Sequence, residues 1–347
     1  MANALVERGI TVDVLCEAPA SKFIDEPLLD ARVGRVVLGR LLLARWRLDR
    51  YVREHPGVRI VAALNHYNLG AAKLKRRCGA NAHVMLTQRE NLSADEAWLS
   101  ESKYARVVRG VREHFNHADA VVTVSQGLAA DLRDNFGVLP SRLHTIYNPA
   151  FRAGFLAAAD SPIDHPWLAQ KDRLVIIAAG RLHHVKAFDD LLHAFARLRK
   201  SVNARLLILG EGKERANLHQ LIEQLGLQEV VQLPGRVGSL APWMARADLF
   251  VLSSRREGLP AVLIEALAIG LPVVSTNCPS GPDEILENGR WGALVPVGDV
   301  SALANAMVEA LRNPSTDHEG RRARASEFSL ERALEQYLQL WRQPPSQ

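Results

Sequence analysis

The second half of the chain alternates short apolar runs with helical patterns, and this alternation restricts the fold more than any other feature. Segments such as Phe188–Arg199 and Ser301–Arg312 have the apolar spacing of helices. Nearly continuous apolar strands are typical of a parallel sheet that is buried on both faces, so we predict a doubly wound α/β sheet. The predicted strands are Leu174–Ala178, Leu206–Leu209, Val230–Leu233, Leu249–Leu252, Val273–Ser275 and Ala293–Val295.

The first half repeats this rhythm less clearly. Its predicted strands are Thr11–Leu15, Ile60–Leu64, Ala82–Leu86, Ala120–Val124 and Leu143–Ile146. Between the first two, apolar residues recur every three or four positions, which predicts one helix stripe formed by Val33, Val37, Leu41, Ala44, Leu48 and Tyr51. Seven arginines decorate the same segment, at positions 32, 35, 40, 45, 47, 50 and 53. Such a basic helix either lies on a membrane surface or packs with its basic face in solvent.

The length of 347 residues suits two domains. We place an N-terminal domain at residues 1–155 and a C-terminal domain at 156–327, with a helix at 328–343 that packs back on the first. The join follows Asn148-Pro149, and the segment 150–172, with its prolines and small residues, suits a linker. Ligands of open α/β sheets bind at the carboxyl ends of the strands, so two facing sheets predict one deep cleft.

Composition narrows the functional classes. No apolar run approaches the ~18 residues of a membrane span, and the start, MANALVERG, lacks the apolar core of a signal peptide. Three scattered cysteines indicate neither disulfides nor zinc, so we expect a cytoplasmic protein. The net charge of +5 falls in residues 1–150, with 21 basic against 16 acidic residues. This basic excess favours binding to an anionic membrane surface or to a phosphorylated ligand, or it is simply a solvated basic surface. The excess is too small to indicate nucleic-acid binding, and no nucleic-acid-binding motif accompanies it.

The most specific motif runs from Arg255 to Leu267, after a predicted strand. Gly258 permits a tight turn and Pro260 suits a helix start, so Glu257 lies in the loop and Glu265 on the helix. Free amides at a helix start bind anions or sugar oxygens, and carboxylates accept hydrogen bonds from neighbouring hydroxyls. The motif therefore predicts a binding site for a hydroxyl-rich or phosphorylated ligand.

Two further sets of loops also follow predicted strands. The loop that starts at Gly180 carries Arg181 and Lys186, two cations that suit a diphosphate, whereas its neighbours His183 and His184 are expected to be ordinary loop residues. In the first half, the segments Asn65–Asn68 and Thr87–Asn91 are expected to open toward the same cleft.

Residues 173–312 resemble the C-terminal domain of retaining GT-B glycosyltransferases of family 4, the "glycosyl transferases group 1". The resemblance rests on GRLHHVKAFDDLLHAF, LLILGEGKER, ADLFVLSSRREGLPAVLIEALAIGLPVVST, CPSGPDEIL and GALVPVGD, and in the first half on ADAVVTVSQGLAADL and RLHTIYNP. It implies that Glu265 holds a nucleotide ribose, that Arg181 and Lys186 bind the diphosphate, and that Glu257 faces the transferred sugar. The other donor-side residues that it implies are Gly180, Arg236, Val237, Gly258, Leu259, Pro260, Gly281 and Pro282.

The resemblance also implies an activity: transfer of a hexose or N-acetylhexosamine from a nucleotide sugar, most simply a UDP-sugar, to a glycan or lipid-linked acceptor. It implies no metal and no other cofactor, and the sequence offers no metal-ligand spacing. Arg89 and Glu90 resemble the acceptor-side loop, which often carries a histidine; His66 is a candidate to supply it, or is a structural residue. The alternatives are a nucleotide-sugar epimerase or phosphorylase on this fold, and a non-catalytic sugar-binding partner of an active transferase.

Two positions depart from the family pattern. Ala187 stands where a glycine usually follows the lysine, which costs about 1 kcal/mol if that position needs a positive φ. A helical pattern begins at Met1 with no strand before it, so Thr11–Leu15 is expected to be the second strand of the fold and the first strand to be missing. We therefore expect a gap in the N-terminal sheet.

Overall fold

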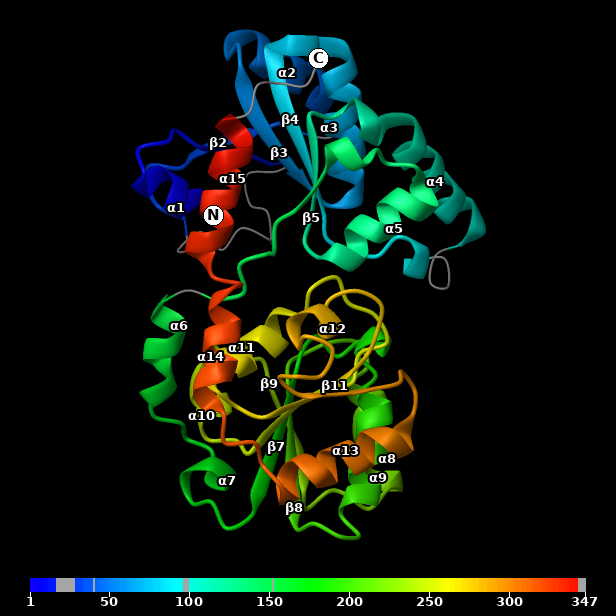
Figure 1. The fold of residues 1–347 in the computed structure, drawn as a ribbon, viewed down its shortest axis with the longest axis vertical. Coiled ribbons are helices and arrows are strands. Elements are labelled where there is room, and N and C mark those ends of the chain that lie inside the picture. Colours follow the sequence, from blue (N-terminus) through cyan, green and yellow to red (C-terminus); the bar gives the residue numbers. More distant parts are fainter. Residues whose placement is uncertain (17–28, 40, 96–99, 152, 343–347) are drawn as a thin grey trace.

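The computed structural model describes residues 1–16, 29–39, 41–95, 100–151 and 153–342. Arg40, residue 152 of the predicted linker and residue 343 of the predicted C-terminal helix lie outside these ranges. Two α/β halves stack on each other, and the carboxyl ends of their strands point toward the boundary between them (Figure 1). The final helix returns from the second half to the first.

The C-terminal half is built on six parallel strands in the order β12-β11-β10-β7-β8-β9. The predicted strands are all present: β7 Leu174–Ala179, β8 Ala204–Leu209, β9 Val231–Gly235, β10 Leu249–Leu252, β11 Val273–Thr276 and β12 Ala293–Val295. The chain runs outward from β7 in both directions, so the order reverses between β7 and β10. Ligands of open α/β sheets bind at such a switch point.

Helices cover both faces of this sheet, which explains its continuous apolar runs. Ile176 and Ala178 of β7 face one cluster, with α8 (Phe188–Leu198), α9 (Arg215–Gln224) and α13 (Val300–Arg312). Val175 and Ile177 face the other, with α7 (Pro166–Ala169), α10 (Ala241–Ala245), α11 (Ala261–Ile269), α12 (Pro282–Ile285) and α14 (His318–Ser326). Because alternate residues of a strand point to opposite faces, two cores require apolar residues at every position.

The N-terminal half has a parallel sheet in the order β3-β4-β5-β6. Its strands are β3 Val58–Ala63, β4 Ala82–Gln88, β5 Ala120–Thr123 and β6 Leu143–Thr145, close to the predicted ranges. Helices α3 (Asn65–Cys78), α4 (Glu101–His114) and α5 (Gln126–Phe136) connect them, followed by the short α6 (Ala153–Ala157). The two sheets together form the fold class that the sequence predicts, two doubly wound α/β units.

The segment before β3 differs from the prediction. The single helix stripe expected from Val33 to Tyr51 is wrong, because Gly34–Val37 forms strand β2 and helix α2 spans only Leu41–Glu54. The β-branched Val36 and Val37 pair in parallel with β1 (Asp13–Cys16), and this pairing outweighs the helical spacing.

Strands β1 and β2 form a separate two-stranded sheet after helix α1 (Ala2–Glu7). Within the described residues no strand pairs with the outer edge of β3 or with the second edge of β1. Thr11–Leu15 therefore does not provide a central strand, and the N-terminal sheet has the interruption that the sequence predicts.

Helix α15 (Leu330–Arg342) packs on the first half of the molecule. Its residues Ala333, Tyr337 and Leu340 share a core with Met85 and Ile146. Leu334 packs with Leu5 of α1 in an adjoining cluster, so α15 connects the four-stranded sheet with α1. Within the described residues no helix is both long and apolar enough to span a lipid bilayer.

Candidate functional site

The strongest motif of the sequence lies at the carboxyl end of β10, next to the loop that follows β7. Lys186 Nζ lies 2.5 Å from Glu257 Oε1, and Ser254 Oγ donates to the same oxygen at 2.6 Å. The side chains of Lys186 and Glu257 are 20% and 11% exposed, so solvent screens this ion pair only in part. Two residues that the sequence assigns to separate motifs thus meet at the switch point of the sheet.

Arg255 holds these two loops together. Its guanidinium donates to His184 O at 2.6 Å and to Asp189 and Asp190 at 2.9 Å each. Its backbone N–H donates to Val185 O at 2.8 Å. Arg255 belongs to the predicted motif, but its sequence context indicates no role for it; the two acidic residues at the start of α8 do not identify their partner.

Glu265 lies in α11, largely out of solvent. Burial raises the pKa of its carboxyl from 4.5 to about 7, and its Oε2 accepts no hydrogen bond from the described residues. A buried acceptor without a donor is costly, so this oxygen is suited to receive a donor from a ligand. The hydroxyls of a sugar supply such donors.

The loop from Glu257 to Pro260 touches the opposite half of the molecule through backbone. A Cβ on Gly258 would lie 1.9 Å from Arg89 O, and one on Gly281, whose φ is +102°, would lie 2.8 Å from Pro260 Cδ. Both positions therefore need glycine, Gly258 because the backbone of the opposite half lies against it and Gly281 because of its positive φ and the adjacent Pro260 ring. The contact also places Arg89 and Glu90, the predicted acceptor-side residues, beside Gly258.

Further contacts hold the two halves face to face. The Glu284 carboxylate accepts from the backbone N–H groups of Gln126 and Gly127, at 2.7 Å each, and so caps the start of α5. Asn91 Nδ2 donates to Ser280 Oγ at 3.0 Å. In Figure 1 the start of α5 faces α12 across the boundary. Sequence reasoning missed these residues, because a contact between distant segments has no local pattern.

The remaining predicted residues lie around this centre. Gly180 lies against the side chain of Lys186, because a Cβ on Gly180 would lie 3.4 Å from Lys186 Cε. Arg181, Arg236 and His66 are exposed on loops or helix starts that follow β7, β9 and β3, and the tilted rings of His66 and Tyr67 have centroids 4.0 Å apart. Val237 packs on the C-terminal core, as does Leu259, and Pro282 is buried at the start of α12.

Two other sequence expectations have structural counterparts. Ala187 has φ 49° and ψ 42°, the left-handed conformation in which glycine is usual. His183 and His184 lie in the loop after β7, and their tilted rings have centroids 4.1 Å apart. In the described part of the chain, no group of three histidine, cysteine, aspartate or glutamate side chains is arranged to hold a metal ion.

These features define a class: two facing α/β units of the GT-B type, with the loops at the carboxyl ends of their strands directed toward each other. The profile of the family described as "Glycosyl transferases group 1" matches residues 173–313, and that of "Glycosyltransferase Family 4" matches residues 1–150. Together they account for both halves, so the chain belongs to the family 4, group 1 glycosyltransferases. The predicted family and GT-B fold are thereby confirmed.

Individual relatives agree with this assignment. The lipopolysaccharide core biosynthesis glycosyltransferase of Rhizobium meliloti is 31% identical, over 67% of this chain and 66% of the relative. N-acetyl-alpha-D-glucosaminyl L-malate synthase of Bacillus anthracis is 28% identical, over 65% and 60%. The chain thus spans slightly under two thirds of these relatives. The structure of Anabaena HepE in complex with UDP has a TM-score of 0.75 at 23% identity, covering 89% of this chain and 86% of that one.

Proposed function

We propose that this protein is a retaining glycosyltransferase that moves a hexose or N-acetylhexosamine from a UDP-sugar to a glycan or lipid-linked acceptor. One observation carries the proposal: the Lys186–Glu257 pair lies at the switch point of the C-terminal sheet, next to the helix that bears Glu265, whose Oε2 accepts no hydrogen bond from the described residues. The family and the UDP complex of Anabaena HepE support the nucleotide. The name of the Rhizobium relative, which concerns lipopolysaccharide core, supports a glycan or glycolipid acceptor.

In this function Glu265 accepts hydrogen bonds from the ribose hydroxyls. Glu257 and the amides that follow Gly258 face the transferred sugar. Lys186 leaves its ion pair with Glu257 and binds the phosphate oxygens of the diphosphate. The exposed Arg181 binds the same diphosphate from the same loop. Both cations then stabilise the negative charge that grows on the departing nucleoside diphosphate, which is where electrostatic catalysis acts.

The acceptor approaches from the N-terminal half. Arg89 and Glu90, held beside Gly258, border its hydroxyl group, and His66 lies at the neighbouring strand end. The acceptor hydroxyl attacks on the face from which the diphosphate leaves, and a leaving phosphate oxygen takes its proton. The configuration of the sugar is retained, and the reaction needs no divalent metal.

We also propose that the protein works at the cytoplasmic face of a membrane as a peripheral protein. Helix α2 exposes Leu43 at 60% and Trp46 at 53%, and the exposed Arg45 and Arg47 lie on either side of Trp46 in the sequence. Apolar side chains flanked by arginines suit an anionic bilayer surface, where the rings and chains enter the interface and the guanidinium groups meet phosphates.

A binding and turnover assay tests the donor site. Nucleotide sugars and UDP are screened by thermal shift, and the best donor is then assayed with glycan acceptors. Glu265→Ala is expected to weaken UDP binding by roughly 1–3 kcal/mol, as for a lost charged hydrogen bond. Glu257→Ala is expected to reduce turnover more than UDP affinity. Turnover is expected to persist in EDTA.

Glu229→Ala, at an exposed position of the same domain, is the control and is expected to change neither quantity. Unchanged UDP affinity in Glu265→Ala together with full activity in Glu257→Ala would refute the site. Release of UDP without an acceptor would favour an epimerase, and UDP binding without any turnover would favour a non-catalytic sugar-binding partner.

A further inference from the structure

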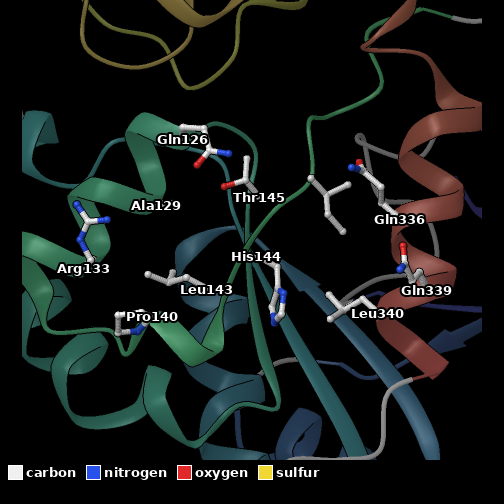
Figure 2. Close-up of a pocket in the computed structure, with 11 residues that line it drawn as sticks. Gln126, Ala129, Arg133, Pro140, Leu143, His144, Thr145, Gln336, Gln339 and Leu340 are labelled. Carbon is white, nitrogen blue, oxygen red and sulfur yellow. The ribbon is translucent and has the colours of Figure 1, made fainter.

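A groove of about 560 Å³ lies beside the N-terminal sheet, away from the loops described above. It is bounded by α5, by the edge strand β6 and by α15, as Figure 2 shows. Its polar lining consists of Gln126, Arg133, His144, Thr145, Gln336 and Gln339. A volume of this size lies within the usual range of small-molecule sites.

The groove is polar, and Arg133 is the one arginine or lysine among the described residues that line it. No carboxylate is among the described residues that line it. Arg133 donates to the carboxylate of its neighbour Asp134 at 2.7 and 2.9 Å, which offsets its charge, and burial lowers the pKa of His144, which favours the neutral ring. The three glutamine amides offer both donors and acceptors. This chemistry fits a neutral ligand with many hydroxyl groups.

The edge of β6 adds backbone groups to this lining. The Ile146 N–H donates to Thr123 O of β5, and β6 pairs with no other strand among the described residues. Because successive residues of a parallel strand direct their backbone groups to opposite edges, the amide of Thr145 points away from β5. Leu143 and Leu340 supply apolar contacts for the C–H faces of a sugar.

One end of the groove reaches the boundary between the two halves. Gln126 lines it and also begins α5, where its backbone N–H donates to Glu284 of the opposite half at 2.7 Å. A chain of sugar units that extends from the cleft along β6 would therefore pass Gln126. We propose that this groove binds neutral sugar units of an oligosaccharide acceptor, beyond the unit that receives the new sugar; this rests on the transfer function proposed above.

Direct binding tests the groove without relying on turnover. The full chain, without donor, is applied to an array of neutral and acidic oligosaccharides. Wild type is expected to bind a subset of the neutral ones. Gln339→Trp, an exposed position whose new ring would fill the groove, is expected to weaken that binding by about tenfold or more. Gln224→Trp, the same change at an exposed position of the C-terminal half, is the control and should bind as wild type.

Two further measurements separate the possible failures. Gln336→Ala, a smaller change, should weaken the same binding in the same direction, and UDP thermal shifts should be equal in all variants. Failure of the transfer function alone would leave UDP and oligosaccharide binding intact without turnover. No binding by wild type, binding of acidic glycans only, or equal binding by wild type and Gln339→Trp would overturn the groove proposal.

Discussion

At the scale of single residues, the site holds charges that a ligand must rearrange. Lys186 is paired with Glu257 at 2.5 Å, and Glu265 keeps an acceptor that no described residue satisfies. The Lys186–Glu257 ion pair offsets part of the desolvation free energy of placing two charged side chains in a partly buried position. The buried Glu265 oxygen keeps its desolvation cost until a donor such as a ligand hydroxyl forms a hydrogen bond with it. In the donor-free protein, the buried Glu265 oxygen thus carries a desolvation cost that the proposed donor would relieve.

The pKa of Glu265 leads to a prediction about stability and pH. Because this pKa is about 7 in the folded state against 4.5 for a free glutamate, the folded protein binds more protons than the unfolded chain between these values. The group therefore lowers the free energy of unfolding as pH rises from about 4.5 to about 7, by on the order of 3 kcal/mol.

Glu265→Gln removes this charge and keeps the shape. The variant is expected to melt at least about 2 °C above wild type at pH 8, with a smaller difference near pH 5, by calorimetry without nucleotide. Glu229→Gln, which is exposed, controls for the loss of charge. A pH-independent difference would mean that Glu265 is ionised in the donor-free protein.

At the scale of elements, both loops and helix ends bring the two halves together. The β10–α11 loop meets the loop after β4 through backbone, at Gly258 and Arg89, and α12 caps α5 through Glu284. The strands fix the ends of these loops, and the loops fix the distance between the donor and acceptor sides. Small changes of shape there should therefore affect turnover more than folding.

Gly258→Ala tests this expectation. The added methyl group would lie 1.9 Å from Arg89 O, so the two loops must separate. Turnover is expected to fall by about tenfold or more, because reacting groups tolerate little misplacement, while UDP affinity changes less. Gly238→Ala adds a methyl group with no atom within 4 Å and is the control. Equal activity of the two variants would show that this contact does not set the geometry of the site.

At the scale of the whole molecule, the N-terminal half bears the basic excess, the exposed apolar pair of α2 and the divided sheet. Leu43 and Trp46 lie on the helix face opposite the predicted apolar stripe, so the sequence pattern indicates a basic helix and only the structure identifies its exposed apolar residues. Arg50 lies over the Trp46 ring at 5.8 Å. These features support the proposed contact with a membrane, because exposed apolar side chains grouped on a surface mark an interaction site.

Vesicle flotation tests the membrane contact. Wild type is expected to float with anionic vesicles and less with neutral ones, and less in 1 M salt, where the Debye length is about 3 Å against about 10 Å at 0.1 M. The double variant Leu43→Ala/Trp46→Ala should float less with anionic vesicles. Leu156→Ala, 43% exposed in wild type and distant in sequence, is the control. Equal recovery with neutral and anionic vesicles would exclude the electrostatic contact.

The sequence by itself determined the strands of the six-stranded and four-stranded sheets and the positions of the loops that follow them. Apolar periodicity is local, and in the parallel sheet of the C-terminal half it identifies all six strands within a few residues. It fails at Gly34–Val37, where valines spaced like a helix stripe pair with β1 instead. The Glu257–Glu265 motif also specifies its own strand, loop and helix start.

Only the tertiary structure decided which distant residues meet. Arg255 joins Asp189 and Asp190, Glu284 caps α5 from a position 157 residues beyond Gly127, and α15 returns to complete the groove beside β6. Such contacts depend on the stacking of elements and on the direction of side chains at their ends. A linear pattern describes neither, because hydrogen bonds between distant segments impose no periodicity on the residues that make them.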